Sequence, residues 1–244
     1  MTLDDILASL FPHGHEVHLA DGLITGRGTL PKGDPIAVIG VGGRTAVGVD
    51  EAARLSVSVL EVIRSGGHVP ILVLVDSDSQ RMSKRDELLG LSEFLAHLAK
   101  CLIYADMSGH PTIGLLYGHT AAGAFIATAL ATRTLLALPG AEPAVMDLPS
   151  MARVTKLSLE VLQEKAKSTP VFAPGLDNLA QTGAVAAILD AGRSLADQLE
   201  ALLSPQTQTK ARMDLRDRLG KERKGRPKAA DIAERVYELA RAQA

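Results

Sequence analysis

The fold of this chain is decided by two stretches, VPILVLVDS at 69–77 and PTIGLLYGHTAAGAFIA at 111–127. The first is an apolar run of strand length, which is typical of a strand buried on both faces. The second begins as another apolar strand and continues, after the loop GHTA, into a helix of small residues. Strands that alternate with helices in this way predict βαβ units and mostly parallel pairing.

Further helices and strands surround these two stretches. A helix is expected over 50–67, where Gly66 and Gly67 form a stop signal. The polar loop DSDSQRMSKRD at 76–86 should lead into a long helix from Glu87 to Met107. The other expected elements are helices over 2–11, 122–131, 150–167, 176–182 and 191–203, and strands over 17–22, 24–30, 35–41, 134–138, 143–147 and 184–190.

The chain divides by composition into residues 1–203, one domain, and residues 204–244. The second part contains a linker, SPQTQTK, a basic run, KERKGRPK at 221–228, and a last helix over 231–243. We expect this part to pack on the domain or on a partner subunit. The basic run could contact a phosphate or an acidic partner, although most such runs are solvated faces.

Composition excludes several classes of protein. The chain has 244 residues, of which 46% are hydrophobic, so wholesale disorder is excluded. Aromatic residues are 3% and the net charge is -2, which argues against a nucleic-acid partner. Cys101 is the only cysteine, which excludes an internal disulfide, and its apolar surroundings predict a buried small side chain. No apolar stretch reaches the ~18 residues of a membrane span and no signal peptide is visible, so we expect a soluble, cytoplasmic protein.

Two strand-to-helix junctions are candidates for chemistry, because the start of a helix presents unpaired N–H groups. The first is 76–80, after the strand at 69–77, and the second is 118–124, where small residues leave the backbone open to a ligand. Two N–H groups directed at one oxygen stabilise an oxyanion, and the loss of one such donor typically costs ~3 kcal/mol. The alternative interpretation of the second junction is that Ala and Gly only let the helix pack closely.

Other signals are weaker. The run GVGG at 40–43 lacks the third glycine of a dinucleotide-binding loop. His13, His15 and His18 have no evident fourth ligand, and we predict no metal site. The basic residues at 81, 84 and 85 could meet a phosphate or a carboxylate, or could form salt bridges with the acidic residues beside them.

The two junctions resemble the carboxyltransferase branch of the crotonase superfamily. The resemblance is carried by GHVPILVLVD at 67–76, ELLGLSEFLAHLAKCLIYA at 87–105, the junction at 111–124 and GAVAAILD at 183–190. It implies an α/β, crotonase-like (ClpP/crotonase) ββα superhelix with a mostly parallel sheet and flanking helices.

Within that branch, SGHPTIGLLYGHTAAGAFIA at 108–127 and LLALPGAEPAVMDLPSMARVTK at 135–156 resemble the gamma subunit of biotin-independent malonate decarboxylase. The residues at 76–79, Asp-Ser-Asp-Ser, differ from the Asp-Thr-Pro-Gly usual in acyl-CoA carboxylase subunits, and the second junction has fewer glycines. The resemblance implies decarboxylation of a malonyl thioester on an acyl carrier protein to acetyl thioester and CO2, with no metal or other bound cofactor. The carrier's phosphopantetheine-type group would bear the thioester.

The resemblance also implies roles for individual residues and partners. The expected catalytic groups are the backbone amides of Ala121, Ala122, Gly123 and Ala124, with His119 as a candidate proton donor and Tyr117 or water as alternatives. The expected substrate-binding residues are Ser77, Ser79, Gln80, Tyr117 and Thr120. A beta subunit, an acyl carrier protein and an acyl-transferring alpha subunit are the implied partners. Two alternatives stay open: a subunit of a biotin-dependent decarboxylase or acyl-CoA carboxylase, and a non-catalytic scaffold.

Overall fold

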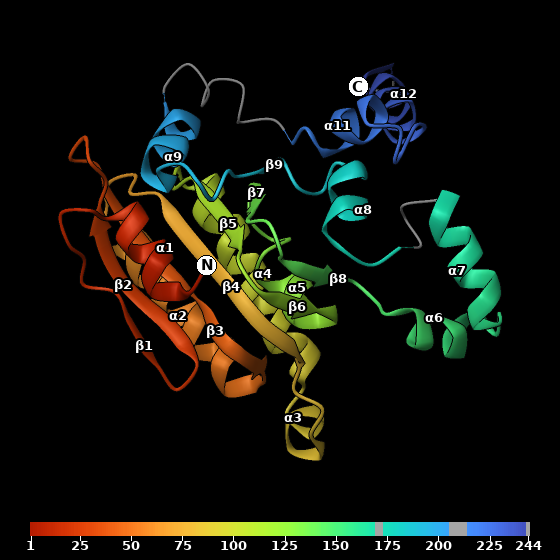
Figure 1. The fold of residues 1–244 in the computed structure, drawn as a ribbon, viewed down its shortest axis with the longest axis horizontal. Coiled ribbons are helices and arrows are strands. Elements are labelled where there is room, and N and C mark those ends of the chain that lie inside the picture. Colours follow the sequence, from red (N-terminus) through yellow and green to blue (C-terminus); the bar gives the residue numbers. More distant parts are fainter. Residues whose placement is uncertain (169–172, 205–213, 243–244) are drawn as a thin grey trace.

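A seven-stranded sheet forms the centre of the molecule, in the order β1-β2-β3-β4-β5-β7-β9 (Figure 1). The computed structural model describes residues 1–168, 173–204 and 214–242. β1 to β3 pair antiparallel, and β3, β4, β5, β7 and β9 pair parallel, which confirms the predicted mostly parallel α/β sheet. A separate parallel pair is formed by β6 and β8. The strands are β1 His18–Ala20, β2 Leu23–Thr29, β3 Pro35–Val47, β4 Ile71–Gln80, β5 Thr112–Leu116, β6 His119–Ala121, β7 Thr134–Ala137, β8 Glu142–Ala144 and β9 Ala187–Ile188.

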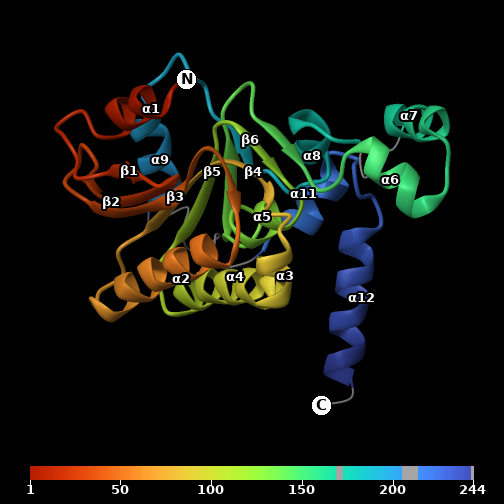
Figure 2. The same cartoon turned by 90° about the horizontal axis from the view of Figure 1, so that it is seen from below.

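Helices cover both faces of the sheet. Figure 2 shows α2 and α4 against one face and α1 and α9 against the other. The helices are α1 Leu3–Leu10, α2 Val49–Arg64, α3 Lys84–Leu88, α4 Leu91–Met107, α5 Ala122–Ala127, α6 Leu148–Thr155, α7 Leu159–Ser168, α8 Leu176–Gln181, α9 Leu195–Leu203, α11 Arg216–Glu222 and α12 Ala229–Ala242. None of these described helices is long and apolar enough to cross a membrane.

The core is divided between the two faces of β4, as its continuous apolar run predicts. Ile71, Val73 and Val75 pack into the cluster on the α2 and α4 side, where Cys101 is also buried. Leu72 and Leu74 face the other way, into the cluster with α1 and α9. Successive side chains of a strand point to opposite faces, so one strand supports both clusters.

β4 and α4 differ from their predicted bounds. The residues predicted as a polar loop from 76 onward extend β4 to Gln80, because they pair with β3 through Thr45↔Ser77 and Val47↔Gln80. The single helix expected over 87–107 is two helices, α3 and α4, interrupted at Gly90, whose φ of 84° lies in the left-handed region that glycine tolerates. Backbone pairing and one glycine therefore override the local polar and helical patterns.

The second half of the chain contains further differences. The predicted loop GHTA is largely β6, which pairs with β8, and the helix after it ends at Ala127 instead of continuing to 131. The helix expected over 150–167 is interrupted at Lys156, which has a φ of 60°. The strand expected over 184–190 pairs with β7 only at Ala187–Ile188, and α9 begins at Leu195.

The end of the chain holds a helix that the pattern did not predict. α11 begins at Arg216 and includes the first residues of the basic run. α12 follows and projects from the body of the molecule in Figure 2. Residues 205–210 of the predicted linker lie outside the described residues.

Candidate functional site

The turn from β6 into α5 has a strained backbone. Ala122, the first residue of α5, has a φ of 49°, and Ala121 before it is extended. The left-handed conformation costs a residue with a Cβ roughly 1–2 kcal/mol, and such strain is concentrated at functional sites. Residues 121–123 are partly exposed, and the next residue, Ala124, is fully buried. The turn thus keeps its backbone at the surface while the helix behind it is anchored in the core.

One carboxylate ties the turn to two other strands. Asp76 Oδ1 accepts a hydrogen bond from the backbone N–H of His119 at 3.0 Å, and Oδ2 accepts one from the backbone N–H of Arg44 at 3.3 Å. A Cβ at Gly118 would lie 2.2 Å from Asp76 Oδ1, so a side chain there would displace the carboxylate. Asp76 therefore holds the ends of β3, β4 and β6 in register.

The two predicted junctions meet in space. Ser77 Oγ and Thr120 Oγ1 are 2.8 Å apart, and both side chains are fully buried. The Gln80 Oε1 atom accepts a hydrogen bond from the N–H of Gly123 at 2.9 Å. Ser79 instead donates its hydroxyl proton to the Gln80 carbonyl at 3.2 Å. Of the backbone amides predicted as oxyanion donors, that of Gly123 is thus already paired with a carbonyl-type oxygen.

The His119 imidazole lies between two carboxylates. Its Nε2 atom is 4.0 Å from Asp78 Oδ1, and its Nδ1 atom is 3.7 Å from Glu142 Oε2. Nδ1 is buried and has no hydrogen-bond partner among the described residues, while both carboxylates are more than half exposed. Glu142 was not among the predicted residues, because only the β6–β8 pairing, which places it opposite His119, brings it to the site.

Tyr117 is half-buried at the end of β5, above the second core cluster. Burial raises the pKa of its hydroxyl, and the nearby Asp76 carboxylate raises the pKa further. The phenol, which like any tyrosine is protonated at neutral pH and can donate a hydrogen bond, therefore stays protonated further into the alkaline range.

Raising the pH should destabilise the protein through Tyr117. In the unfolded chain a tyrosine ionises near pH 10, whereas the raised pKa keeps folded Tyr117 protonated. Above about pH 10 the unfolded state binds fewer protons than the folded state, so the free energy of unfolding falls as pH rises. Denaturant unfolding at pH 9 and pH 11 should show a smaller loss of stability for Tyr117→Phe than for the wild type. The exposed Tyr104 supplies the matched control, Tyr104→Phe, and equal losses in all three proteins would contradict the prediction.

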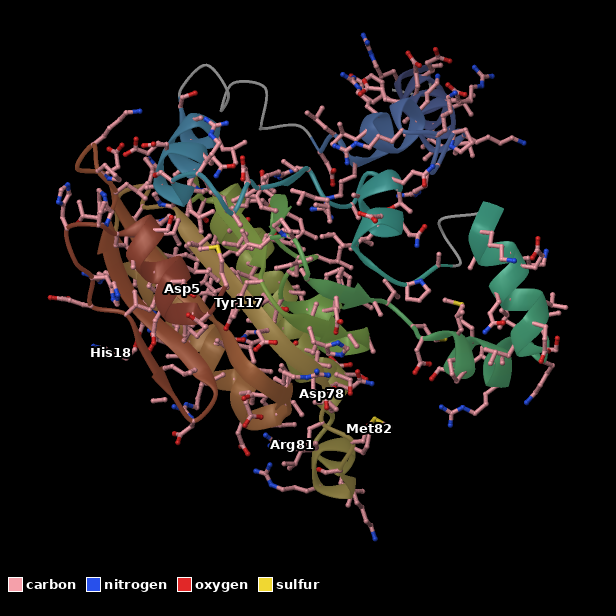
Figure 3. The ribbon with its side chains drawn as sticks, in the orientation of Figure 1. Asp5, His18, Asp78, Arg81, Met82 and Tyr117 are labelled. Carbon is pink, nitrogen blue, oxygen red and sulfur yellow. The ribbon has the colours of Figure 1, made fainter. Side chains whose placement is uncertain are left out.

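Other predicted candidates lie apart from this site or have structural partners. Arg81 pairs with Glu51 at 2.6 Å, and Arg85 pairs with Asp50 at 2.8 Å, so salt bridges account for these two side chains. The GVGG run lies within β3. His18 lies on β1, the edge strand of the sheet, away from Asp78 (Figure 3). Within the described ranges, no group of three or more His, Cys, Asp or Glu could hold a metal ion.

Comparison with known proteins gives matches over most of the chain. The family model of the malonate decarboxylase gamma subunit matches residues 42–240. The malonyl-S-ACP:biotin-protein carboxyltransferase MADD of Malonomonas rubra is 29% identical over 153 residues, which are 59% of this chain and 52% of that relative. The chain thus spans about half the length of this curated relative.

Solved structures extend the similarity to the whole fold. A chain of a Pseudomonas malonate decarboxylase hetero-tetramer in complex with coenzyme A superimposes with a TM-score of 0.74 at 26% identity, over 98% of both chains. The transcarboxylase 12S multienzyme core superimposes with a TM-score of 0.66 at 17% identity, over 85% of this chain and 40% of that chain. The predicted crotonase-like carboxyltransferase fold is confirmed.

Proposed function

The chain belongs to the malonate decarboxylase gamma-subunit family, and from that premise we propose that it works with a beta subunit to decarboxylate malonyl-S-acyl carrier protein. The products are acetyl-S-acyl carrier protein and CO2. The family match covers both junctions and the C-terminal helices, and the superposition on the Pseudomonas chain spans 98% of this chain.

The observation that carries the proposal is the hydrogen bond from Gly123 N–H to Gln80 Oε1 beside the strained Ala122. The amide oxygen of Gln80 is itself a carbonyl oxygen, and its hydrogen bond supports the proposal that the Gly123 N–H can receive the oxygen of a thioester. The backbone amides at 121–124 remain our candidate donors, with Gly123 as the best supported. In this proposal the thioester oxygen displaces the Gln80 oxygen.

The chemistry needs only stabilisation of charge and one proton. The electrons of the breaking carbon–carboxylate bond move into the thioester, giving an enolate oxygen and free CO2. Donors already directed at that oxygen favour the transition state over the ground state. A proton then adds to the carbon of the enolate, and we propose His119, between Asp78 and Glu142, as its source. Tyr117 and Thr120 would border the thioester, and the Ser77 and Thr120 hydroxyls would keep the two junctions together.

Partners complete the site in this proposal. The chain resembles a member of a hetero-tetramer that was solved with coenzyme A, and a thioester of the phosphopantetheine type shares the reactive end of that molecule. We propose that a beta subunit of the same fold supplies the other half of the pocket. An acyl carrier protein would present the substrate, and an alpha subunit would load the carrier with malonate.

A second candidate is favoured by one observation, the similarity to the Malonomonas relative, whose name includes a biotin protein. In that case the carboxyl group would pass to biotin instead of leaving as CO2. Adding avidin to the reconstituted complex tests this. CO2 release from malonyl-S-acyl carrier protein that is insensitive to avidin supports the decarboxylase, and complete inhibition by avidin supports the biotin-dependent carboxyltransferase.

Gln80→Ala should lower the KM for the malonyl thioester about five-fold and leave kcat nearly unchanged. The variant removes the oxygen that competes for Gly123 N–H, and a net hydrogen bond of about 1 kcal/mol corresponds to that factor. Gln80→Glu should raise the KM, because a carboxylate is a stronger acceptor than an amide. If the KM rises in Gln80→Ala as well, Gln80 contacts the substrate and does not compete with it.

A further inference from the structure

The segment 214–228 carries an excess of positive charge on a chain whose net charge is -2. It contains seven Lys and Arg against three Asp and Glu. Four of its basic residues are exposed and form no ion pair with any described residue, and we call this set the basic face: Arg218, Lys224, Arg226 and Lys228.

The basic face is held in a fixed position. Arg223 donates to the carbonyl oxygens of Ala180 and Val185 at 2.7 and 2.6 Å, and to that of Ala186 at 2.8 Å. A Cβ at Gly225 would lie 2.2 Å from the Gln181 carbonyl oxygen, so the two backbones approach too closely for a side chain. A solvated run of charges requires neither a part-buried guanidinium group with three carbonyl partners nor such close backbone contact, so these contacts indicate that the position of the neighbouring charges matters.

The segment that carries the basic face contacts elements next to the candidate site through Arg216 and Arg223. Arg216 donates to the Leu130 carbonyl oxygen at 3.1 Å, just beyond the end of α5, the helix of the strained turn. On the other side, Arg223 contacts α8, and the Gly175 N–H before α8 donates to Pro143 in β8, the partner of β6. Figures 1 and 2 both show α11 beside α8. A pocket of about 400 Å³, lined in part by Ile188 and Arg223, lies beside α8.

We propose that the basic face is the docking surface for the acyl carrier protein, and this inference rests on the proposed function. A carrier protein bears a phosphodiester where its prosthetic arm is attached, so a negative charge always lies at the base of that arm. Complementary charges raise the encounter rate and suppress wrong partners. The basic face would hold the carrier surface around this phosphate while the arm reaches toward α5.

Binding of the carrier to the complete beta–gamma complex tests the proposal without relying on turnover. Fluorescence anisotropy of labelled, phosphopantetheinylated carrier protein should show at least a ten-fold weaker Kd for Lys224→Glu with Lys228→Glu than for the wild type. The wild-type Kd should weaken as salt rises, because exposed charges are screened. Lys100→Glu with Arg193→Glu, the same charge change at exposed positions elsewhere, should leave the Kd within about two-fold of the wild type.

Turnover separates this inference from the proposed function. The KM for malonyl-S-acyl carrier protein should rise in the 224/228 variant, while the KM for malonyl-pantetheine, which has no phosphate or carrier, should stay unchanged. If the wild-type complex binds the carrier through Lys224 and Lys228 but releases no CO2, the docking surface is supported and the proposed decarboxylase function is wrong. Equal carrier affinity in the two double variants, or an equal rise of KM for both substrates, would overturn the docking surface.

Discussion

Gly123→Phe should reduce CO2 release by the beta–gamma complex at least about 100-fold. A Cβ at position 123 would already lie 3.1 Å from both Gln80 Oε1 and Leu95 Cδ1, so a phenyl ring there must fill the space in front of the Gly123 amide. Loss of one donor of an oxyanion hole typically reduces kcat 10²–10³-fold. Turnover of malonyl-S-acyl carrier protein under saturating substrate is the measurement.

Two variants control for folding and for bulk. Ala122→Gly keeps the left-handed backbone and relieves its strain, so it should retain activity and unfold at a slightly higher temperature. Ile126→Phe places a similar ring on the same helix at a half-exposed position and should remain active. If Gly123→Phe still copurifies with the beta subunit and retains activity, the amide is not a donor and the scaffold interpretation gains support.

The isolated chain should be at least about 10³-fold slower than the beta–gamma complex on malonyl-S-acyl carrier protein. Residues 121–123 are partly exposed in the single chain, and His119 faces carboxylates that are more than half exposed. Hydrogen-bond donors stabilise an oxyanion strongly only where water is excluded, and a barrier difference of roughly 4 kcal/mol corresponds to this factor. The partner subunit is expected to cover the turn.

Titrating the purified beta subunit into the chain measures this directly. CO2 release should rise with beta subunit and saturate at a fixed ratio of the two chains. The beta subunit alone provides the control for activity that does not depend on this chain. Comparable rates for the isolated chain and the complex would show that one subunit contains a complete, sheltered site.

The sequence by itself determined the parts of the fold that repeat with a regular period. The run at 69–77 predicted a strand buried on both faces, and alternate residues of its segment 71–75 do pack into the two core clusters. Small residues at 121–124 predicted a turn with accessible backbone, because the absence of bulky side chains is a local property. Both features are present in the structure, because burial depends on the type and spacing of side chains along the chain.

Only the tertiary structure decided how the polar groups pair. Asp76 with His119, Ser77 with Thr120 and Gln80 with Gly123 are each separated by 43 residues. A hydrogen bond between distant groups depends on strand order and register, which leave no periodic trace in either segment. For the same reason the pattern of the basic run predicted its exposed charges but not the part-buried Arg223, which donates to three carbonyl groups. The pattern of buried residues thus follows from local spacing along the chain, whereas the pairing of polar groups depends on how the strands are arranged in the folded protein.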